Sequence, residues 1–358
     1  MKKFWLALLI ALLFISGCVK SSPPNPNGLP KADAPPNKVH TATITETNAP
    51  KYFIPSTVIP DGSLFGMSGN NLTYWNPRNS ELKSTGSAWS GMLSPDATKI
   101  AFINEQGLNV LDVNTGSITS VVQNSSQDDS SLALGLWSPN SGEFLYMYVR
   151  EWSSDYFIYN IETEEKTAYK FQNIPNFLSS PVDWYNDGLL FIVHANRSKS
   201  GEQEYRESGY RSDLMLADMD GNCTPLTRLD DGQFALYGGT SSNHQHILVV
   251  IWESESKSSA GVLNNSDGII DYLPGQENTV GGSISPDGQF AILISATSED
   301  GRYNARLFDM TSNTVILQKE LAGPEPPRHF MWSKDSCNVS FGILGSDDNS
   351  TLYTVNIK

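Results

Sequence analysis

Short runs of hydrophobic residues, separated by polar turns, dominate the chain beyond its first 40 residues. Typical runs are Lys99–Ile103, Glu143–Tyr148 and Leu189–Val193. Runs of this length are typical of strands, and no segment beyond the N-terminal region shows a hydrophobic period near 3.6 residues. The pattern therefore predicts an all-β protein.

One turn motif precedes many of these runs. Its clearest copies, Leu93–Asp96, Trp137–Asn140 and Ile284–Gly288, share a Ser-Pro-Asp or Ser-Pro-Asn core. Weaker copies are Val58–Gly62, Trp184–Gly188, Thr240–Asn243 and Trp332–Asp335. The Asp or Asn of the motif recurs about every 46 residues, which indicates an internal repeat.

When the run before each copy of the motif is counted, every unit has four short antiparallel strands. Tight turns such as Asn114–Gly116 and Asp220–Asn222 are typical of hairpins, because their residues tolerate positive φ. A repeat of this length with four strands is typical of a β-propeller blade. A lone four-stranded sheet leaves both faces exposed, so the blades must stack around an axis. Seven copies predict seven blades.

The last unit ends with its third strand, Leu352–Ile357. Its fourth strand is expected from the N-terminal segment Thr41–Thr47, in which every second residue is threonine. The predicted fold is therefore an all-β, seven-bladed β-propeller of four-stranded antiparallel blades, closed by an N-terminal strand and spanning residues 41–358. The alternative is a β-sandwich whose turns are similar by accident.

The motif and the frame from Ser94 to Gly116 resemble the WD-repeat-like propeller unit of TolB-type proteins. The resemblance covers about residues 41–358, and its motifs are degenerate around Thr240–His246. It implies a propeller that binds proteins or ligands. It implies no reaction, because the same fold also occurs as the non-catalytic propeller of prolyl-oligopeptidase-type enzymes.

The N-terminus has the features of a secretory signal. Lys2 and Lys3 precede the apolar run Phe4–Ile15, which predicts a signal peptide over residues 1–17. Ile15–Cys18 resembles the bacterial lipobox, which implies that Cys18 carries diacylglycerol and that the leader is cut before it. Two acyl chains are enough for stable anchoring. The alternative is an ordinary secretory leader with a chance cysteine.

Residues 18–40 contain the lipidated cysteine and a segment rich in Pro, Ser and Asn. Such a composition cannot bury a core, so we expect an extended tether. The expected location is extracytoplasmic, with the protein anchored to the cell-envelope membrane as a lipoprotein.

The composition and charge of the chain restrict the classes of expected partner. Acidic residues outnumber basic ones 39 to 24, and the net charge is −15. Nucleic acid is not an expected partner, because an acidic surface repels phosphate. Hydrophobic residues make up 39% of the chain, enough for a large core. We expect a monomer.

Two further expectations concern buried residues. Trp137, Trp184 and Trp332 precede the motif turn and are expected to pack between blades rather than to stack on a ligand. Cys223 and Cys337 lie three units apart, too far for a disulfide, so we expect two separate, buried or inert thiols.

No motif of a known catalytic centre is present, so no catalytic residue, metal ligand or cofactor is predicted. His244 and His246 form the only close histidine pair, and a structural role is favoured because His244 falls where the turn usually has glycine. Some propellers of this superfamily are metal-dependent polysaccharide lyases. The alternative function is therefore such a lyase or a hydrolase, with an axial metal held by His194, His244 and His329.

The connections between strands differ in length. Turns between first and second strands, and between third and fourth, are short, whereas the other connections are long. Antiparallel pairing places the two kinds on opposite faces, and insertions on one face of a repeat array commonly carry its interactions. Aromatic residues and arginines of the long connections are the candidate ligand-binding residues: Trp152, Tyr205, Arg206, Tyr210, Arg211, Arg302 and Tyr303. The alternative is a set of hydrated loops without a ligand.

These observations favour a lipid-anchored extracytoplasmic propeller that serves as a non-catalytic binding or scaffold module. Its partner is expected to be a protein, a peptide or an envelope glycan. Whether the protein is an enzyme stays open at this point, with a non-enzyme favoured.

Overall fold

Every regular element in the described part of the chain is a β-strand. The computed structural model describes residues 40–358, except for 60, 124–130, 151–152, 173–178, 186–187, 196–210, 231, 255–256, 266–267, 276, 328 and 346–348. The side chains of His194, Ala195 and Arg211 are also not described. Within these limits, no helix is long and apolar enough to cross a membrane.

The strands follow one another in groups of four, here called blades 1 to 7. Blade 1 contains β2 (Phe53–Val58), β3 (Leu64–Ser68), β4 (Asn71–Asn76) and β5 (Glu81–Ser87). Blade 2 contains β6 (Ser90–Leu93), β7 (Lys99–Asn104), β8 (Gly107–Asp112) and β9 (Ile118–Gln123). Blade 3 contains β10 (Ser131–Trp137), β11 (Glu143–Val149), β12 (Ser154–Asn160) and β13 (Lys166–Tyr169). Blade 4 contains β14 (Ser179–Trp184), β15 (Gly188–Ala195), β16 (Arg211–Asp218) and β17 (Cys223–Pro225). Blade 5 contains β18 (Phe234–Thr240), β19 (His246–Ser254), β20 (Lys257–Asn264) and β21 (Ile270–Tyr272). Blade 6 contains β22 (Thr279–Ile284), β23 (Phe290–Ala296), β24 (Arg302–Asp309) and β25 (Thr314–Ala322). Blade 7 contains β26 (Phe330–Trp332), β27 (Asn338–Leu344), β28 (Ser350–Ile357) and β1 (Ala42–Ala49).

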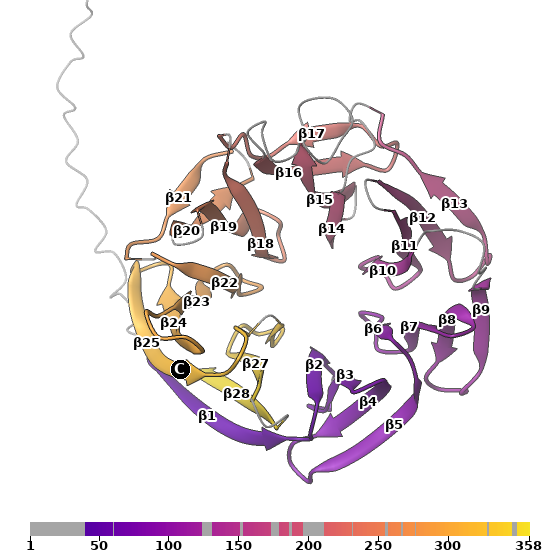
Figure 1. Ribbon diagram of the computed structural model, residues 1–358, viewed down its shortest axis with the longest axis horizontal. Helices are drawn as coiled ribbons and strands as arrows, with labels where there is room; N and C mark the ends of the chain where they lie inside the picture. The colour runs from indigo at the N-terminus through magenta and orange to yellow at the C-terminus, as the bar shows by residue number, and fades with distance from the viewer. Residues whose placement is uncertain are drawn as a thin grey trace, which may run out of the picture. The chain divides into compact units, whose positions relative to one another are not determined.

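The blades form a ring. Five are separate four-stranded sheets, and blades 4 and 5 join in one eight-stranded sheet. Within each blade the strands pair antiparallel with their neighbours. Figure 1 shows the blades around a central opening, with the first strand of each innermost and the fourth outermost. The predicted all-β, seven-bladed propeller is confirmed.

The N-terminal strand completes blade 7. β1 pairs antiparallel with β28 over eight residues, from Ala42 opposite Ile357 to Ala49 opposite Ser350. Just outside this ladder, the Thr41 and Lys358 backbones exchange two hydrogen bonds of 3.1 and 2.9 Å. Ring closure by an N-terminal strand is therefore confirmed, with the bounds Ala42–Ala49.

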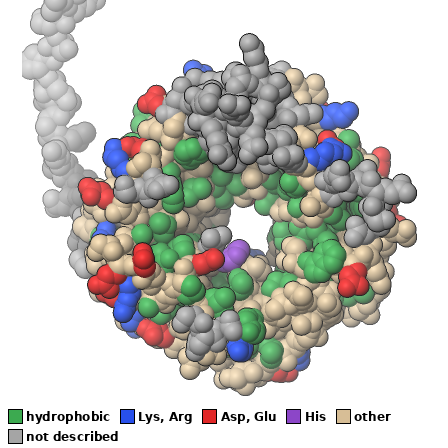
Figure 2. Space-filling view, in the orientation of Figure 1, with side chains coloured by type: hydrophobic (Ala, Val, Ile, Leu, Met, Phe, Trp, Pro, Cys, Tyr) green, Lys and Arg blue, Asp and Glu red, His purple; other side chains and the backbone are tan. Residues whose placement is uncertain are grey.

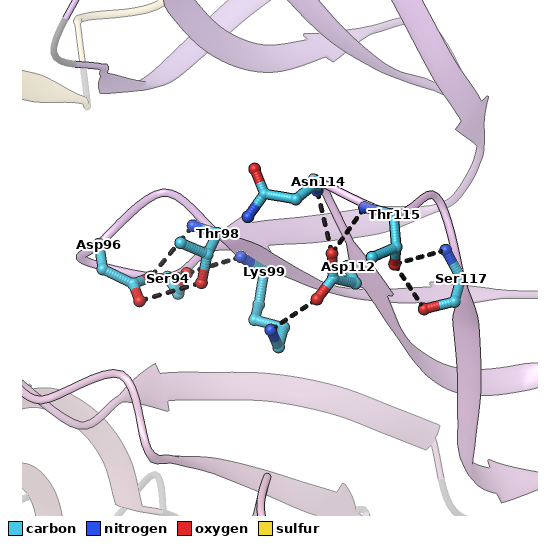
Figure 3. A network of polar contacts seen from close by, with 8 residues as sticks. All are labelled: Ser94, Asp96, Thr98, Lys99, Asp112, Asn114, Thr115 and Ser117. Atoms are coloured by element: carbon cyan, nitrogen blue, oxygen red, sulfur yellow. Dashed lines mark hydrogen bonds and ion pairs between the residues drawn. The ribbon is translucent and has the colours of Figure 1, made fainter.

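The repeated turn motif has the same hydrogen bonds in five blades. In blade 2, Ser94 Oγ donates to Asp96 Oδ1 at 2.6 Å and accepts from the Lys99 backbone N–H at 3.0 Å (Figure 3). The equivalent pairs of bonds occur at Ser138, Ser241, Ser285 and Ser333. Because the two side chains satisfy polar groups of the turn locally, the same residue types recur in these five blades.

The residue after the Asp or Asn has a positive φ in these turns, for example 61° at Ala97, 56° at His244 and 73° at Gly288. This conformation is unfavourable for residues with a side chain. Serine at this position has a second use, because Ser141 Oγ accepts a 3.1 Å hydrogen bond from the backbone N–H of Asp96 in the preceding blade. The turns thus also connect neighbouring blades.

The hydrophobic core lies between the faces of neighbouring blades. Trp137 Nε1 donates to the Met92 carbonyl oxygen of the preceding blade, and Trp332 Nε1 donates to Ser283 Oγ, each at 3.1 Å. Trp184 is 5% exposed and packs in one cluster with residues of blade 3. The expectation that these three tryptophans pack between blades is confirmed.

Blades 4 and 5 depart from the repeat. The outer strand β17 has only three residues, and the connection 226–233 continues beside β16 up to a single parallel pair, Ser212 with Phe234. The Asp213 carboxylate is 2% exposed and accepts hydrogen bonds from Thr227 Oγ1 and the Leu229 N–H. Asp213 therefore anchors the connection that joins the two blades.

The two faces of the ring differ in the connections that they carry. The short-turn face has the turns between first and second and between third and fourth strands, such as 94–98 and 113–117. The long-loop face has the remaining connections, including 323–329 between blades 6 and 7. However, the connections 69–70, 88–89 and 105–106 on this face have only two residues, and β19 and β20 of blade 5 are likewise separated by two. The expectation of long connections throughout is therefore wrong for blades 1, 2 and 5.

Candidate functional site

A pocket of about 440 Å³ lies at the long-loop ends of strands from blades 7 and 1. We call it the seam pocket, because the ring closes at blade 7. Three segments form it: the start of β2, the connection 323–329 and the end of β27. Its lining residues are Phe53, Ile54, Pro55, Pro324, Glu325, Pro326, His329, Gly342, Ile343 and Leu344.

The walls of the seam pocket are mostly apolar. Phe53 and Ile343 belong to the buried core, whereas Ile54 is 44% exposed. Gly342 keeps space in the wall, because a Cβ there would lie 3.0 Å from Pro55 Cδ. Pockets of about 300–1,000 Å³ with apolar walls and a few polar groups are typical small-ligand or side-chain sites.

Two polar side chains, Glu325 and His329, line the same pocket and are exposed. Both belong to the connection 323–329, in which three of the residues are prolines. Prolines have a fixed φ and no N–H donor, so this wall is stiff and offers few hydrogen bonds. The two side chains therefore provide polar groups at the edge of an otherwise apolar cavity.

Next to the pocket, the turn between β1 and β2 exposes an aromatic residue. Tyr52 is 44% exposed and has a φ of 57°, while the Phe53 N–H donates to the Pro50 carbonyl oxygen at 3.0 Å. A positive φ is rare for a bulky residue. The Lys51 ammonium lies 5.1 Å from the centre of the Tyr52 ring.

Other apolar residues are exposed close to the central opening. Trp89, in the connection from blade 1 to blade 2, is 58% exposed, and Leu236 on the inner strand β18 is 37% exposed. Figure 2 shows hydrophobic side chains gathered around the central opening, with Lys and Arg mostly toward the outer edge. Exposed Trp and Tyr are typical anchors of interfaces, so this region is the candidate binding surface.

Most residues proposed from the sequence lie outside the described part. These are the lipidation site Cys18 and the ligand-binding candidates Trp152, Tyr205, Arg206 and Tyr210. Arg211 begins β16 opposite Ala195, but its side chain is not described. All of them stay predictions.

The remaining two candidates begin β24 in blade 6. Arg302 is exposed, and its Nη1 lies 2.9 Å from Glu320 Oε1 on the adjacent strand. Tyr303 is 9% exposed and packs in the core cluster between blades 6 and 7. Arg302 therefore lies on the surface near the long-loop face, and the Tyr303 ring contributes mainly to the core.

The described histidine side chains do not come together at one site. His244, in a turn of the short-turn face, stacks on Tyr185 with ring centres 3.9 Å apart. His329 precedes β26 and lies at the long-loop face, one strand length away. Among the described residues, no group of three or more His, Cys, Asp or Glu side chains is placed to hold a metal ion. His244 and His329 are therefore not placed to share one metal ion, and His194, whose side chain is not described, stays a prediction.

A partly buried polar cluster joins the inner strands of blades 4 and 5. Tyr237 Oη donates to Asp183 Oδ2 at 2.5 Å and contacts Thr240 Oγ1 at 2.8 Å. Burial, together with the nearby Asp183 carboxylate, raises the pKa of Tyr237 well above its usual value. The phenol thus stays protonated and continues to donate, which suits a structural clamp between these blades.

The two cysteines are free thiols in different environments. Burial and the nearby Asp218 carboxylate raise the pKa of Cys223 to about 11, so this thiol is unreactive at neutral pH. Cys337 is exposed. The expectation of two separate thiols is confirmed. Cys337 lies in a surface turn rather than in the core, and its inertness stays a prediction.

Comparisons with solved structures support the fold. The chain is similar to an oligogalacturonate lyase in complex with manganese (TM-score 0.63, 12% identity, 88% of this chain and 91% of that one). It is also similar to the β-propeller domain of the Trilobed protease from Pyrococcus furiosus (0.57, 16%, 85% and 95%). TolB from Acinetobacter baumannii matches with a TM-score of 0.48 at 16% identity, over 77% of this chain and 63% of that one. At such identities the likenesses to the lyase and to the Trilobed protease domain show the propeller fold alone.

No protein-family model matches the sequence, and no curated protein matches it. The propeller part of the resemblance inferred from the sequence is therefore confirmed, whereas a specific relation to TolB-type proteins stays a prediction.

The seam pocket was not predicted from the sequence. Its residues come from segments near positions 54, 326 and 343, which ring closure brings together. One signal was present, since Pro324, Pro326 and Pro327 are concentrated in a single connection of the long-loop face.

Proposed function

We propose that the protein is a lipid-anchored extracytoplasmic binding module that holds a protein or peptide on its long-loop face and catalyses no reaction. The observation that carries this proposal is the seam pocket, an apolar cavity of about 440 Å³ bordered by exposed Ile54. Tyr52, Trp89 and Leu236 are further exposed apolar side chains, in the turn before β2, in the connection before β6 and on the inner strand β18. A glycan is a second possible partner, and the experiment below separates the two.

The point at which the described chain enters the propeller is compatible with this function. The first described residue, His40, contacts Asp309, which ends a strand at the short-turn face. The seam pocket lies at the opposite, long-loop face.

The anchor is tested by Cys18→Ser. We expect the variant to move from the membrane fraction to the soluble fraction of the envelope, because it has no thiol for the lipid. Persistent membrane association that resists salt would contradict lipid anchoring.

The binding surface is tested by photo-crosslinking in the native envelope. A crosslinking amino acid at Ile54 should give a discrete adduct. At Ile118, which is 62% exposed on the outer strand β9, it should give none. Protease-sensitive adducts identify a protein partner, and glycosidase-sensitive adducts identify a glycan. Equal labelling from both positions would contradict a specific surface.

The lyase or hydrolase alternative is tested by metal analysis of the purified chain. Stoichiometric manganese or zinc, together with cleavage of a polysaccharide, would replace the binding proposal by a catalytic one.

A further inference from the structure

We infer that the seam pocket takes a bulky apolar side chain of a partner peptide whose neighbouring residues are basic and lie over blade 6. This inference rests on the proposed function and adds the chemical class of the partner.

The first argument is the shape of the pocket. Its walls are built from Phe53, Ile343, Leu344 and the prolines of the connection 323–329, and its volume suits one large side chain with part of the adjoining backbone. Because buried and proline-containing walls lose little freedom on binding, such a pocket is largely pre-organised. An aromatic or large aliphatic anchor is the expected occupant.

The second argument is the charge beside the pocket. The long-loop connections of blade 6 contain four exposed acidic residues, namely Glu277, Glu299, Asp300 and Glu325. Glu277, Glu299 and Asp300 form no ion pair with any described residue. Of the cations near these connections, Arg302 is held by Glu320, and the Arg306 guanidinium donates to the Gly275 carbonyl oxygen. The described surface on this side of the pocket is therefore acidic.

The other side of the pocket differs. Lys51 lies there, with its ammonium over the Tyr52 ring. Among the described residues beside the pocket, the acidic excess is thus on the blade 6 side, and the whole chain has a net charge of −15. Complementary charges raise the association rate and select the correct partner. Basic residues of a bound peptide are therefore placed over blade 6, on one side of the anchor.

The test measures binding of defined fluorescent peptides to the detergent-solubilised full chain by anisotropy. The probes are a Lys-Lys-Gly-Trp peptide, the same peptide with Trp replaced by Ala, and the same peptide with both Lys replaced by Glu. We expect only the first to bind, and we expect its affinity to fall as salt is added, because salt screens exposed charges.

Two pairs of variants locate the bound peptide. Ile54→Arg should weaken binding about tenfold or more, because it fills and charges the pocket, whereas Val58→Arg, on the same strand but outside the pocket, should not. The double variant Glu299→Lys, Asp300→Lys should weaken binding about threefold to tenfold at low salt. Glu105→Lys is its control, since Glu105 is exposed on the same face in blade 2.

Each contrary result has a defined meaning. Equal binding of the acidic peptide overturns the basic class of partner, while the pocket remains the binding site. Absence of binding by all three peptides, with the Ile54 crosslink still formed, overturns the inference and leaves the proposed function intact. Loss of that crosslink overturns the proposed function itself.

Discussion

The seam between blades 7 and 1 and the junction between blades 4 and 5 both interrupt the regular repeat, in opposite ways. At the seam, strands from the two ends of the chain complete the ring, and an apolar pocket of about 440 Å³ lies beside it. Blades 4 and 5 instead share one continuous sheet, with Asp183 and Tyr237 hydrogen-bonded between their inner strands. The seam therefore has an open pocket, whereas the blade 4–5 junction has hydrogen bonds between its inner strands.

This difference indicates where the propeller can bind a ligand. A buried polar cluster that is fully paired makes a junction rigid and specific, because any displacement leaves polar groups without partners. Filling an apolar pocket carries no such penalty. When an apolar group replaces water in the pocket, the free energy falls. The seam is therefore suited to a ligand and the blade 4–5 junction to stability.

The largest expected effect is that of truncating a buried isoleucine at each place. Ile247→Ala, in the core cluster between blades 4 and 5, and Ile343→Ala, which lines the seam pocket, should each lower the free energy of unfolding by about 2–5 kcal/mol. Ile247 and Ile343 are 0% and 4% exposed. We expect the smaller loss for Ile343→Ala, because the adjoining pocket admits water. Urea unfolding measures both, and a larger loss at the seam would contradict the comparison.

The next effect is expected at Asp213. Asp213→Ala should lower the free energy of unfolding by about 2–3 kcal/mol, because the Leu229 N–H and Thr227 hydroxyl lose their buried acceptor. Asp230→Ala is the matched control, since Asp230 is exposed in the same connection. Similar midpoints for the two variants would show that the clamp does not stabilise the junction.

A smaller effect is expected for Tyr237→Phe. The substitution leaves the Asp183 carboxylate without its phenol donor, and we expect a loss of about 1–2 kcal/mol. Tyr272→Phe serves as the control because Tyr272 is 58% exposed. Thermal unfolding of both variants tests this, and an unchanged midpoint for Tyr237→Phe would argue against the clamp.

The smallest effect is expected at the start of the propeller, where His40 Nδ1 lies 2.9 Å from Asp309 Oδ2. Burial acts to raise the pKa of Asp309, but hydrogen bonds from His40, Ser312 and Thr311 together lower it below its usual value. A lowered pKa in the folded state stabilises the protein above the unfolded value of about 3.9, and this contribution is lost as the pH falls through the folded pKa.

His40→Ala should therefore lower the free energy of unfolding by about 0.5–1 kcal/mol near pH 5, with the difference shrinking toward about pH 2. Unfolding curves over this pH range provide the measurement. A difference that grows on acidification would contradict the contact between His40 and Asp309.

The blades were predictable because their signals are local. The bonds of Ser94 with Asp96 and Lys99 connect residues at most five apart, so the turn motif forms wherever its residues occur. The closing strand was predictable from counting strands, because the last unit lacked one. The short connections of blades 1, 2 and 5 were missed, since strand ends are not marked in the sequence as clearly as the motif turns.

The site was less predictable. Tyr303 was expected to face a ligand, but its ring is only 9% exposed, because alternate residues of a strand point to opposite faces. Tyr52 and Trp89 were not singled out, although both are exposed next to inner strands. Their exposure depends on which neighbouring blade covers them, and the sequence does not contain that information.

By itself, then, the amino-acid sequence determined the strands, the turns that join them, the number of blades and the way in which the ring closes. These follow from hydrogen bonds and hydrophobic alternation within a few residues. Only the tertiary structure decided that β2, β27 and the connection 323–329 form a pocket, and that His244 and His329 stay apart. Such contacts join residues far apart in the chain, so they exist only after the ring has closed.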